Sequence, residues 1–184
     1  ALAAVVGVGV VGAGTYLGVR VLHGSTPVAT PAVRAAAITF TVRDYDPQGG
    51  DGESPTQVPR AYDHDPATAW YTEKYHGSSK FGGYAKTGVG LVLEASAGYR
   101  PTQVNLLGAT PGAPFEIRKL GPLTGPALAS GVMSDATQHL ALPAGTTGPL
   151  VVWITGLVPI EGNPGYYWAG VREVSMDGVP NRGA

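Results

Sequence analysis

The sequence predicts an all-β domain, a β-sandwich of the jelly-roll type, and three observations lead to this prediction. From Ile38 onward, apolar and polar residues alternate with the period of two that β-strands have. Clusters of Gly and Pro separate the alternating runs, as turns separate strands. No stretch of ten or more residues in this region has the i, i+3, i+4 spacing of an amphipathic helix. We therefore expect about eight strands and no helices.

The expected strands are marked by alternating apolar residues. In chain order these are Ile38 with Phe40 and Val42, Val89 with Leu91 and Leu93, Val104 with Leu106, Phe115 with Ile117, Leu140 with Leu142, and Val174 with Met176. The run Leu150–Ile154 is apolar at every position, which is typical of a central strand with both faces covered. We expect Trp153 in this run, like Trp70, to lie in the core between the sheets.

The first residues form a separate, apolar segment. Ala1–Val19 carries no charge, and the apolar run continues past Arg20. About 20 apolar residues suffice to cross the hydrocarbon core of a bilayer. We expect the sequence to begin at or just inside a membrane span. The expected division of the chain is a single transmembrane helix at 1–22, a linker at 23–37, a folded domain at 38–178 and a C-terminal tail at 179–184.

This segment has three other interpretations. A signal peptide stays open, but no A-x-A cleavage site follows the apolar run closely and no basic region precedes it. A buried core helix is disfavoured because the segment is not amphipathic. Gly7–Gly12 matches the G-x-G-x-x-G dinucleotide fingerprint, but the first acidic residue is Asp44, too far along for that motif.

Composition excludes several classes of function. Twelve basic and thirteen acidic residues are well mixed and give a net charge of −1, so nucleic acid is not an expected partner. The sequence has no cysteine, which excludes disulfides and thiolate metal sites. No G-x-S-x-G, H-E-x-x-H or P-loop motif is present, and the four histidines lack metal-ligand spacing. We therefore expect a domain that binds rather than one that catalyses.

Two segments resemble a known family. Ala61–Trp70 (AYDHDPATAW) is similar to the A-x-D-G-D-x-x-T-x-W signature of discoidin-like domains, which are also called F5/8 type C domains. Gly170–Gly178 (GVREVSMDG) is similar to their final strand. The resemblance covers roughly residues 38–178 and implies a galactose-binding-like jelly-roll β-sandwich.

A narrower resemblance rests on further strings. Asp46–Glu53 (DPQGGDGE), Trp70–Thr72 and Gly88–Leu91 look like the C-terminal extracytoplasmic domain of actinobacterial MviN-type lipid II flippases and associated kinase-like membrane proteins. In that setting, a kinase-like or flippase part and a membrane span precede the domain. The resemblance implies a place in cell-wall peptidoglycan biosynthesis.

The discoidin-like signature also implies a metal site. In that family the acidic turn and a glutamate of the last strand often hold a structural Ca²⁺, and the matching residues here are Asp63, Asp65, Thr68 and Glu173. Closely spaced oxygen ligands suit this hard cation. The alternative is an Asx-turn whose side chains bond local amides. His64 replaces the glycine of the family's turn, so we expect backbone strain there.

A second acidic stretch contains Asp44, Asp46, Asp51 and Glu53. It is not an EF-hand, because the position that needs a bidentate Glu is Pro55. A solvated acidic loop is the favoured interpretation, and a loop-borne cation site is the alternative.

Aromatic residues in Gly- and Ser-rich stretches are the candidate ligand contacts. Exposed aromatic rings with a polar tip can stack on sugar rings and bond hydroxyl groups. The candidates are Tyr75, His76, Tyr84, Tyr166 and Tyr167. The alternative is that these side chains only pack at strand ends.

Together these observations predict a membrane-anchored, non-catalytic domain on the extracytoplasmic side. We expect it to recognise a cell-wall glycan or a lipid-linked peptidoglycan precursor through its aromatic loops. The alternative is a protein–protein interaction or spacer domain of a membrane protein of cell-wall synthesis, which an exposed apolar patch in place of an aromatic cleft would favour.

Overall fold

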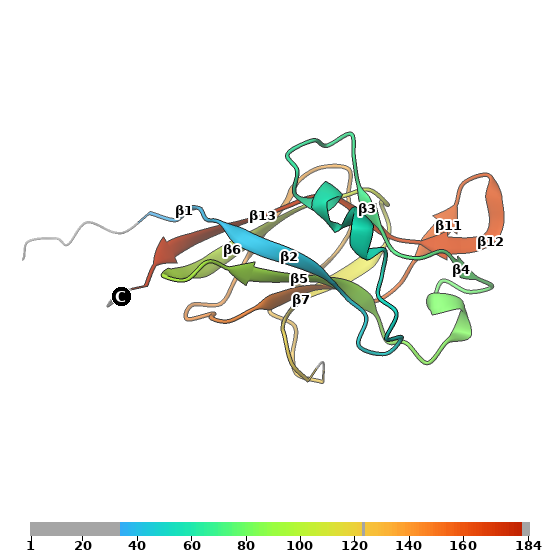
Figure 1. Cartoon of the computed structure of the whole chain (residues 1–184), viewed down its shortest axis with the longest axis horizontal. Helices are drawn as coiled ribbons and strands as arrows, with labels where there is room; N and C mark the ends of the chain where they lie inside the picture. Colours follow the sequence, from blue (N-terminus) through green and yellow to red (C-terminus); the bar gives the residue numbers. More distant parts are fainter. Residues whose placement is uncertain (1–33, 123, 182–184) are drawn as a thin grey trace, which may run out of the picture. The chain divides into compact units, whose positions relative to one another are not determined.

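The computed structural model of the chain describes residues 34–122 and 124–181. These residues form thirteen β-strands and two short 3-10 helices (Figure 1). The elements, in chain order, are β1 (Ala36–Ala37), β2 (Phe40–Tyr45), η1 (Pro55–Ala61), β3 (Trp70–Tyr71), β4 (Tyr75–His76), η2 (Phe81–Gly83), β5 (Val89–Ala95), β6 (Tyr99–Gly108), β7 (Pro114–Lys119), β8 (Ala129–Val132), β9 (Gln138–Ala141), β10 (Leu150–Ile154), β11 (Val158–Ile160), β12 (Asn163–Trp168) and β13 (Gly170–Pro180). The predicted all-β class is confirmed, but the expectation of about eight strands and no helices is wrong.

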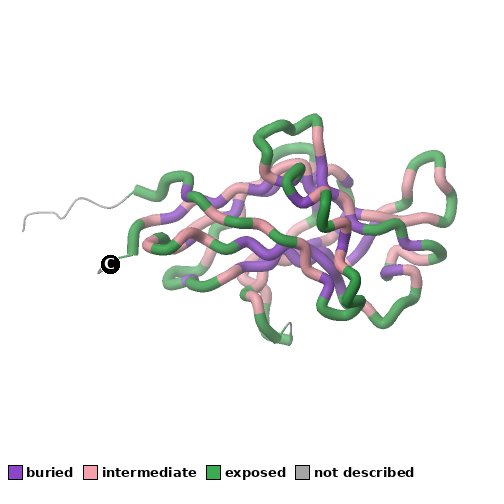
Figure 2. Tube along the Cα trace, in the orientation of Figure 1, coloured by how far each residue is buried: buried purple, intermediate pink, exposed green. Residues whose placement is uncertain are grey.

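Two sheets enclose the core. One has the strand order β2-β5-β10-β7-β8, and the other has the order β1-β13-β6-β9 with β3 also paired to β13. Leu91 and Leu93 of β5 share one continuous cluster of buried side chains with Val104 and Leu106 of β6. The predicted sandwich is therefore confirmed. Figure 2 shows the buried residues along these strands and the exposed residues in the connecting loops.

Strand β10 lies in the middle of its sheet, paired to β5 on one side and to β7 on the other. All five of its residues are buried, as the continuous apolar run predicted. Its side chains alternate between the sheet's faces: Leu150 and Val152 join the main core, whereas Val151 and Trp153 form a separate cluster with Val92 of β5. The prediction that Trp153 lies between the sheets is therefore wrong; its indole is buried on the outer face.

Trp70 occupies the core, as predicted. It is fully buried, and its indole N–H donates a hydrogen bond of 2.8 Å to the main-chain carbonyl of Glu53. This bond ties the loop after β2 to the strand that follows the acidic turn. Trp70 thus links this loop to the core of the sandwich.

Strand pairing extends slightly beyond the expected domain bounds of 38–178. Ala36–Ala37 pair with β13, and Val179 and Pro180 of β13 pair with β6. The first and last described strands therefore lie side by side at one end of the sandwich (Figure 1).

A third sheet, in the order β11-β12-β4, lies at the other end of the sandwich (Figure 1). A two-residue connection, Glu161–Gly162, joins β11 to β12, and Gly162 has φ +71, which glycine adopts without strain. Of the aromatic residues expected in loops, Tyr75 and His76 lie in β4 and Tyr166 and Tyr167 lie in β12, whereas Tyr84 lies between η2 and β5, as expected. This end of the molecule carries the candidate site.

The expected transmembrane helix at 1–22 lies outside the described residues. Across residues 34–122 and 124–181, the structure contains no helix with the length and apolar character that crossing a membrane requires.

Candidate functional site

The loop after β2 is held in shape by two aspartates. Asp44 accepts a hydrogen bond of 2.9 Å from the main-chain N–H of Glu53, which closes the loop across nine residues. Asp46 accepts one of 2.8 Å from the N–H of Gly49. Gly49 has no room for a side chain, because a Cβ there would lie 1.8 Å from Oδ2 of Asp46. The sequence in this loop therefore specifies one compact conformation.

Glu53 is fully buried beneath this loop. Its Oε2 accepts a hydrogen bond of 2.8 Å from the N–H of Glu73, and its Oε1 accepts hydrogen bonds from the Tyr75 hydroxyl and, at 3.2 Å, from the Lys86 ammonium. A buried carboxylate is stable only when its oxygens are bonded in this way. The interpretation of this stretch as a solvated acidic loop is therefore wrong for Glu53, and also for Asp46, which is buried as well.

Lys86 joins these groups. Its Nζ lies 2.8 Å from Asp46 Oδ2, 3.2 Å from Glu53 Oε1 and 3.0 Å from the Tyr75 hydroxyl. Its side chain is 9% exposed and that of Asp46 is fully buried. We call Asp46, Glu53, Tyr75 and Lys86 the buried charge network.

The contacts of the network shift the pKa of Glu53, Tyr75 and Lys86. Burial raises the pKa of the Glu53 carboxyl, although the hydrogen bonds from Tyr75 and Glu73 oppose this. Burial, and then the hydrogen bond to Glu53, raise the pKa of the Tyr75 phenol. Burial alone would lower the pKa of Lys86, but the hydrogen bonds with Asp46 and Tyr75 and the charge of Glu53 raise it. Tyr75 and Lys86 therefore stay protonated at neutral pH.

A cavity of about 400 Å³ opens above this network, and we call it the loop-end pocket. Its lining residues are Gln48, Gly49, Asp51, Glu73, Lys74, Tyr75, Tyr84, Ala85 and Lys86. The rings of Tyr75 and Tyr84 meet edge to face, with centroids 6.3 Å apart, and Tyr84 is 69% exposed. The pocket thus combines an exposed aromatic ring with charged groups of both signs.

Next to it, one face of the small sheet carries aromatic rings. His76 and Tyr166 are cross-strand partners and meet edge to face, with centroids 4.9 Å apart. Trp168, two residues further along β12, stacks on Tyr71 with centroids 4.2 Å apart and planes 17° from parallel. The ammonium of Lys74 lies 5.9 Å from the Trp168 centroid, within cation–π range. We call these five residues the aromatic face.

The structure brings the predicted ligand contacts together but gives them different roles. His76 is exposed and Tyr166 half-buried on the aromatic face, and Tyr84 projects beside the loop-end pocket. Tyr75 and Tyr167 are cross-strand partners on the sheet's opposite face, where Tyr167 packs against the core. The expectation of an exposed, loop-borne Tyr75 is wrong, since Tyr75 lies in β4 and is 4% exposed.

No family model matches the sequence. Among solved structures, the chain is similar to a family 89 glycoside hydrolase from Clostridium perfringens in complex with 2-acetamido-1,2-dideoxynojirimycin, with a TM-score of 0.51 and 11% identity over 77% of this chain and 14% of that one. It shares the fold of one part of that hydrolase.

Two further structures resemble the chain. One is a truncated AlyQ with CBM32 and alginate lyase domains (TM-score 0.48, 18% identity, 82% of this chain and 35% of that chain). The other is the family 32 CBM from C. perfringens NanJ in complex with galactose (TM-score 0.45, 14% identity, 76% and 93%). The chain spans about a third or less of the hydrolase and of the truncated AlyQ.

The acidic turn of the predicted calcium site has the geometry of an Asx-turn. Asp63 accepts hydrogen bonds of 3.0 Å from the N–H of Asp65 and 2.8 Å from the Thr68 hydroxyl, and these bonds lower its pKa. Asp65 accepts one of 2.9 Å from the N–H of Ala67. His64 has φ +64, so the expected left-handed strain at the glycine position of the signature is confirmed.

Glu173 of β13 meets Asp63 at this turn. Burial, followed by the hydrogen bond and the charge of Asp63, raises the pKa of the Glu173 carboxyl. Its Oε1 is buried with no hydrogen-bond partner among the described residues. Asp63, Thr68 and Glu173 thus converge, whereas Asp65 accepts a hydrogen bond within the turn through its Oδ1. No group of three or more His, Asp or Glu side chains in the described part of the chain is arranged to hold a metal.

The sequence did not indicate Lys86 as the partner of the acidic loop. It also did not indicate which aromatic residues of β12 lie on the same face. The period of two within Tyr166–Trp168 could have assigned Tyr166 and Trp168 to one face and Tyr167 to the other. Lys86 gave no such signal, since 40 residues separate it from Asp46.

Proposed function

We propose that this chain is a non-catalytic glycan-binding domain and that its ligand occupies the loop-end pocket and the aromatic face. The observation that carries the proposal is the position of Tyr84, an exposed ring at the rim of a cavity lined by charged groups. Rings of this kind cover the apolar face of a sugar, and charged or polar side chains bond its hydroxyls.

The two surfaces provide complementary contacts. In the pocket, the carboxylates of Asp51 and Glu73 would accept hydrogen bonds from a ligand, and the ammonium of Lys74 would donate them. The buried charge network fixes the pocket floor, so little conformational freedom is lost when a ligand binds. Lys74 also lies over Trp168 of the aromatic face. A glycan of several sugars can therefore contact both surfaces at once.

We further propose that the glycan belongs to the cell wall or to a lipid-linked peptidoglycan precursor, and that the domain faces the extracytoplasmic side of a membrane to which residues 1–22 anchor it. The apolar run at 1–22 and the resemblance of the domain to those of MviN-type and kinase-like proteins support this. An anchor restricts the domain to substrates near the bilayer, which raises their effective concentration.

A structural Ca²⁺ is also part of the proposal. The buried, unpartnered Oε1 of Glu173 and the adjacent carboxyl of Asp63 fit a hard cation, and Asp63, Thr68 and Glu173 would hold it together with nearby main-chain carbonyls. The cation would supply charge neutralisation between two carboxyl groups that otherwise repel. Asp65 would shape the turn rather than bind the metal.

Isothermal titration of the full 184-residue chain with muropeptides and a soluble lipid II analogue tests the function. We expect saturable heat that Tyr84→Ala and Tyr166→Ala each weaken about tenfold or more. Tyr99→Ala is the matched control, because Tyr99 is 44% exposed at the start of β6 and lines neither surface. The absence of heat with every glycan would replace this proposal with the interaction-or-spacer alternative.

A further inference from the structure

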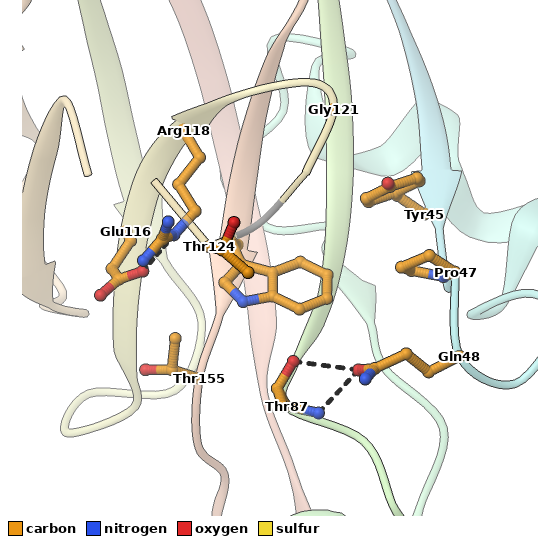
Figure 3. A pocket seen from close by; sticks show the side chains of 10 residues that line it. Tyr45, Pro47, Gln48, Thr87, Glu116, Arg118, Gly121, Thr124 and Thr155 are labelled. Carbon is orange, nitrogen blue, oxygen red and sulfur yellow. Dashed lines mark hydrogen bonds and ion pairs between the residues drawn. The ribbon is translucent and has the colours of Figure 1, made fainter. Parts of the chain in front are cut away.

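A second cavity of about 550 Å³ lies over the outer face of the β2-β5-β10-β7-β8 sheet, and we call it the sheet-face groove. Figure 3 shows Glu116, Arg118 and Thr155 on one side of it and Tyr45, Pro47 and Gln48 on the other. The indole of Trp153 also lines it. Its volume falls within the range of roughly 300–1,000 Å³ that small-molecule sites have.

The aromatic part of the groove is rigid. The rings of Trp153 and Tyr45 lie with centroids 6.0 Å apart and planes 59° from parallel. Gly88 leaves the space that the indole occupies, since a Cβ there would lie 2.4 Å from Cε2 of Trp153. The guanidinium of Arg43 lies 5.9 Å from the centroid of the Tyr45 ring, within cation–π range. A ligand would therefore meet a preformed wall.

Polar groups around this wall are oriented for a ligand. Oε1 of Gln48 accepts hydrogen bonds from the N–H (2.7 Å) and hydroxyl (3.1 Å) of Thr87, which leaves the amide N–H₂ of Gln48 to donate elsewhere. Oε2 of Glu116 accepts from Arg118, and Oε1 stays available as an acceptor. Within residues 34–122 and 124–181, the indole N–H of Trp153 has no hydrogen-bond partner and is not among the buried unpartnered atoms.

The groove favours a neutral ligand. Glu116 and Arg118 are its charged lining residues, and they neutralise each other as an ion pair. A peptide cannot add to the sheet here as a strand, because β10 beneath the groove is paired on both sides. The half-buried ring of Tyr45, which packs against the indole of Trp153, lies among side-chain donors and acceptors without net charge. This combination matches a ligand ring with apolar C–H faces and several hydroxyls.

We infer that the sheet-face groove is a second binding site, for a neutral carbohydrate. This inference does not depend on the loop-end pocket. The lining of that pocket holds four charged residues, whereas the charged residues of the sheet-face groove are the ion pair of Glu116 and Arg118. The two cavities share Gln48, so the sites adjoin across the loop after β2. One glycan chain long enough to reach both sites would bind with a combined affinity above that of either site alone.

Intrinsic tryptophan fluorescence of the full chain tests the inference. In a Trp168→Phe background, Trp70 is sealed in the core, so Trp153 is the tryptophan next to a cavity. The probes are cellotriose, maltotriose and triacetylchitotriose as neutral sugars, trigalacturonate as an acidic sugar and trialanine as a peptide. We expect a saturable change with a neutral trisaccharide, about tenfold weaker in Tyr45→Ala.

Tyr99→Ala is the control and should leave this titration unchanged, because Tyr99 lines neither cavity. Glu116→Gln is a second test variant in case Tyr45→Ala fails to fold. The Glu116 side chain is 27% exposed, and glutamine has nearly the same shape. Glu116→Gln should also weaken the binding of the neutral trisaccharide. The inference is overturned if no neutral trisaccharide changes the tryptophan emission. It is also overturned if trialanine or trigalacturonate changes the emission and the neutral sugars do not. A third contrary result is that Tyr84→Ala abolishes the change in emission while Tyr45→Ala leaves it intact. The last result would assign the binding to the loop-end pocket.

Discussion

The ammonium of Lys86 lies 2.8 Å from Oδ2 of Asp46, and this ion pair supports the wall between the two cavities. Asp46 also accepts the N–H of Gly49, which fixes the turn that presents Gln48 to both the loop-end pocket and the sheet-face groove. The conformation of one loop therefore governs two proposed sites, and its stability depends on a buried ion pair.

Lys86→Met should destabilise the protein by about 3–5 kcal/mol, because it leaves the buried carboxylates of Asp46 and Glu53 without their cation. The loss should be smaller at pH 5 than at pH 8, since protonation of Glu53, whose pKa burial raises, relieves the unpaired charge. Urea unfolding of the full chain at both pH values measures this.

Lys119→Met is the matched control for Lys86→Met. Lys119 is exposed at the end of β7, and its replacement should change the free energy of unfolding by no more than about 0.5 kcal/mol. Equal effects of the two substitutions would contradict the structural role of the buried charge network.

The strands could be predicted from the sequence because their signal is local. The alternation at Val89, Leu91 and Leu93 places these side chains on one face whatever lies opposite, and all three are in the core. In Leu150–Ile154 every residue is apolar, so no polar residue marks which face is outside. Which side chains of β10 face the core depends on the pairing of β10 with β5 and β7, which the sequence pattern does not show. The prediction for Trp153 was therefore wrong.

The candidate site was only partly predictable for a related reason. The aromatic residues stood out by composition, but β4 has only two residues, and Pro164 and Gly165 make the start of β12 resemble a turn, so the short alternation in Tyr166–Trp168 did not by itself indicate a strand. The state of Glu53 depends on Tyr75 and Lys86, which come from elements 22 and 33 residues away. A carboxylate of an acidic loop cannot be recognised as buried until the partner that neutralises it is known.

Tyr75→Phe should change the alkaline limit of stability. The pKa of the Tyr75 phenol is raised above 10.0 in the folded state, so its contribution to stability is complete below pH 10 and is lost as the pH rises through the folded-state pKa. The variant lacks this loss, and its melting temperature should fall less steeply between about pH 9.5 and 11. The variant also lacks the hydrogen bond between Lys86 and Tyr75 that helps to raise the pKa of Lys86, so the loss of stability from Lys86 at high pH should be smaller as well. Parallel melting curves across this range would show that Tyr75 does not titrate differently in the folded state.

Glu173→Gln tests the paired carboxyls at the acidic turn. The pKa of Glu173 is raised above 4.5, so its contribution to stability is complete below pH 4.5 and is lost as the pH rises through the folded-state pKa. In EDTA, the variant should therefore lose less stability than the native protein as the pH rises from 4 to 7. Glu53 is unchanged in both proteins and cancels in the comparison.

The same variant should respond less to calcium. A cation that binds the folded state raises the melting temperature as its concentration passes its dissociation constant. At pH 7 we expect calcium to stabilise the native protein and to have little effect on Glu173→Gln or Asp63→Asn. A calcium-induced shift that survives both substitutions would assign the cation to another place.

Gly49→Ala should uncouple the loop from the ion pair without changing any charge. The backbone of Gly49 is not left-handed, so alanine brings no conformational strain, but its Cβ would lie 1.8 Å from Oδ2 of Asp46 and 2.7 Å from Nζ of Lys86. Both side chains would have to move away from residue 49. This overpacking should lower the free energy of unfolding by about 1–3 kcal/mol. Gly125→Ala is the control, since a Cβ there meets nothing within 4 Å. If thermal melts show no difference between the two variants, the loop after β2 tolerates displacement of Asp46, and the shared support of the two cavities is refuted.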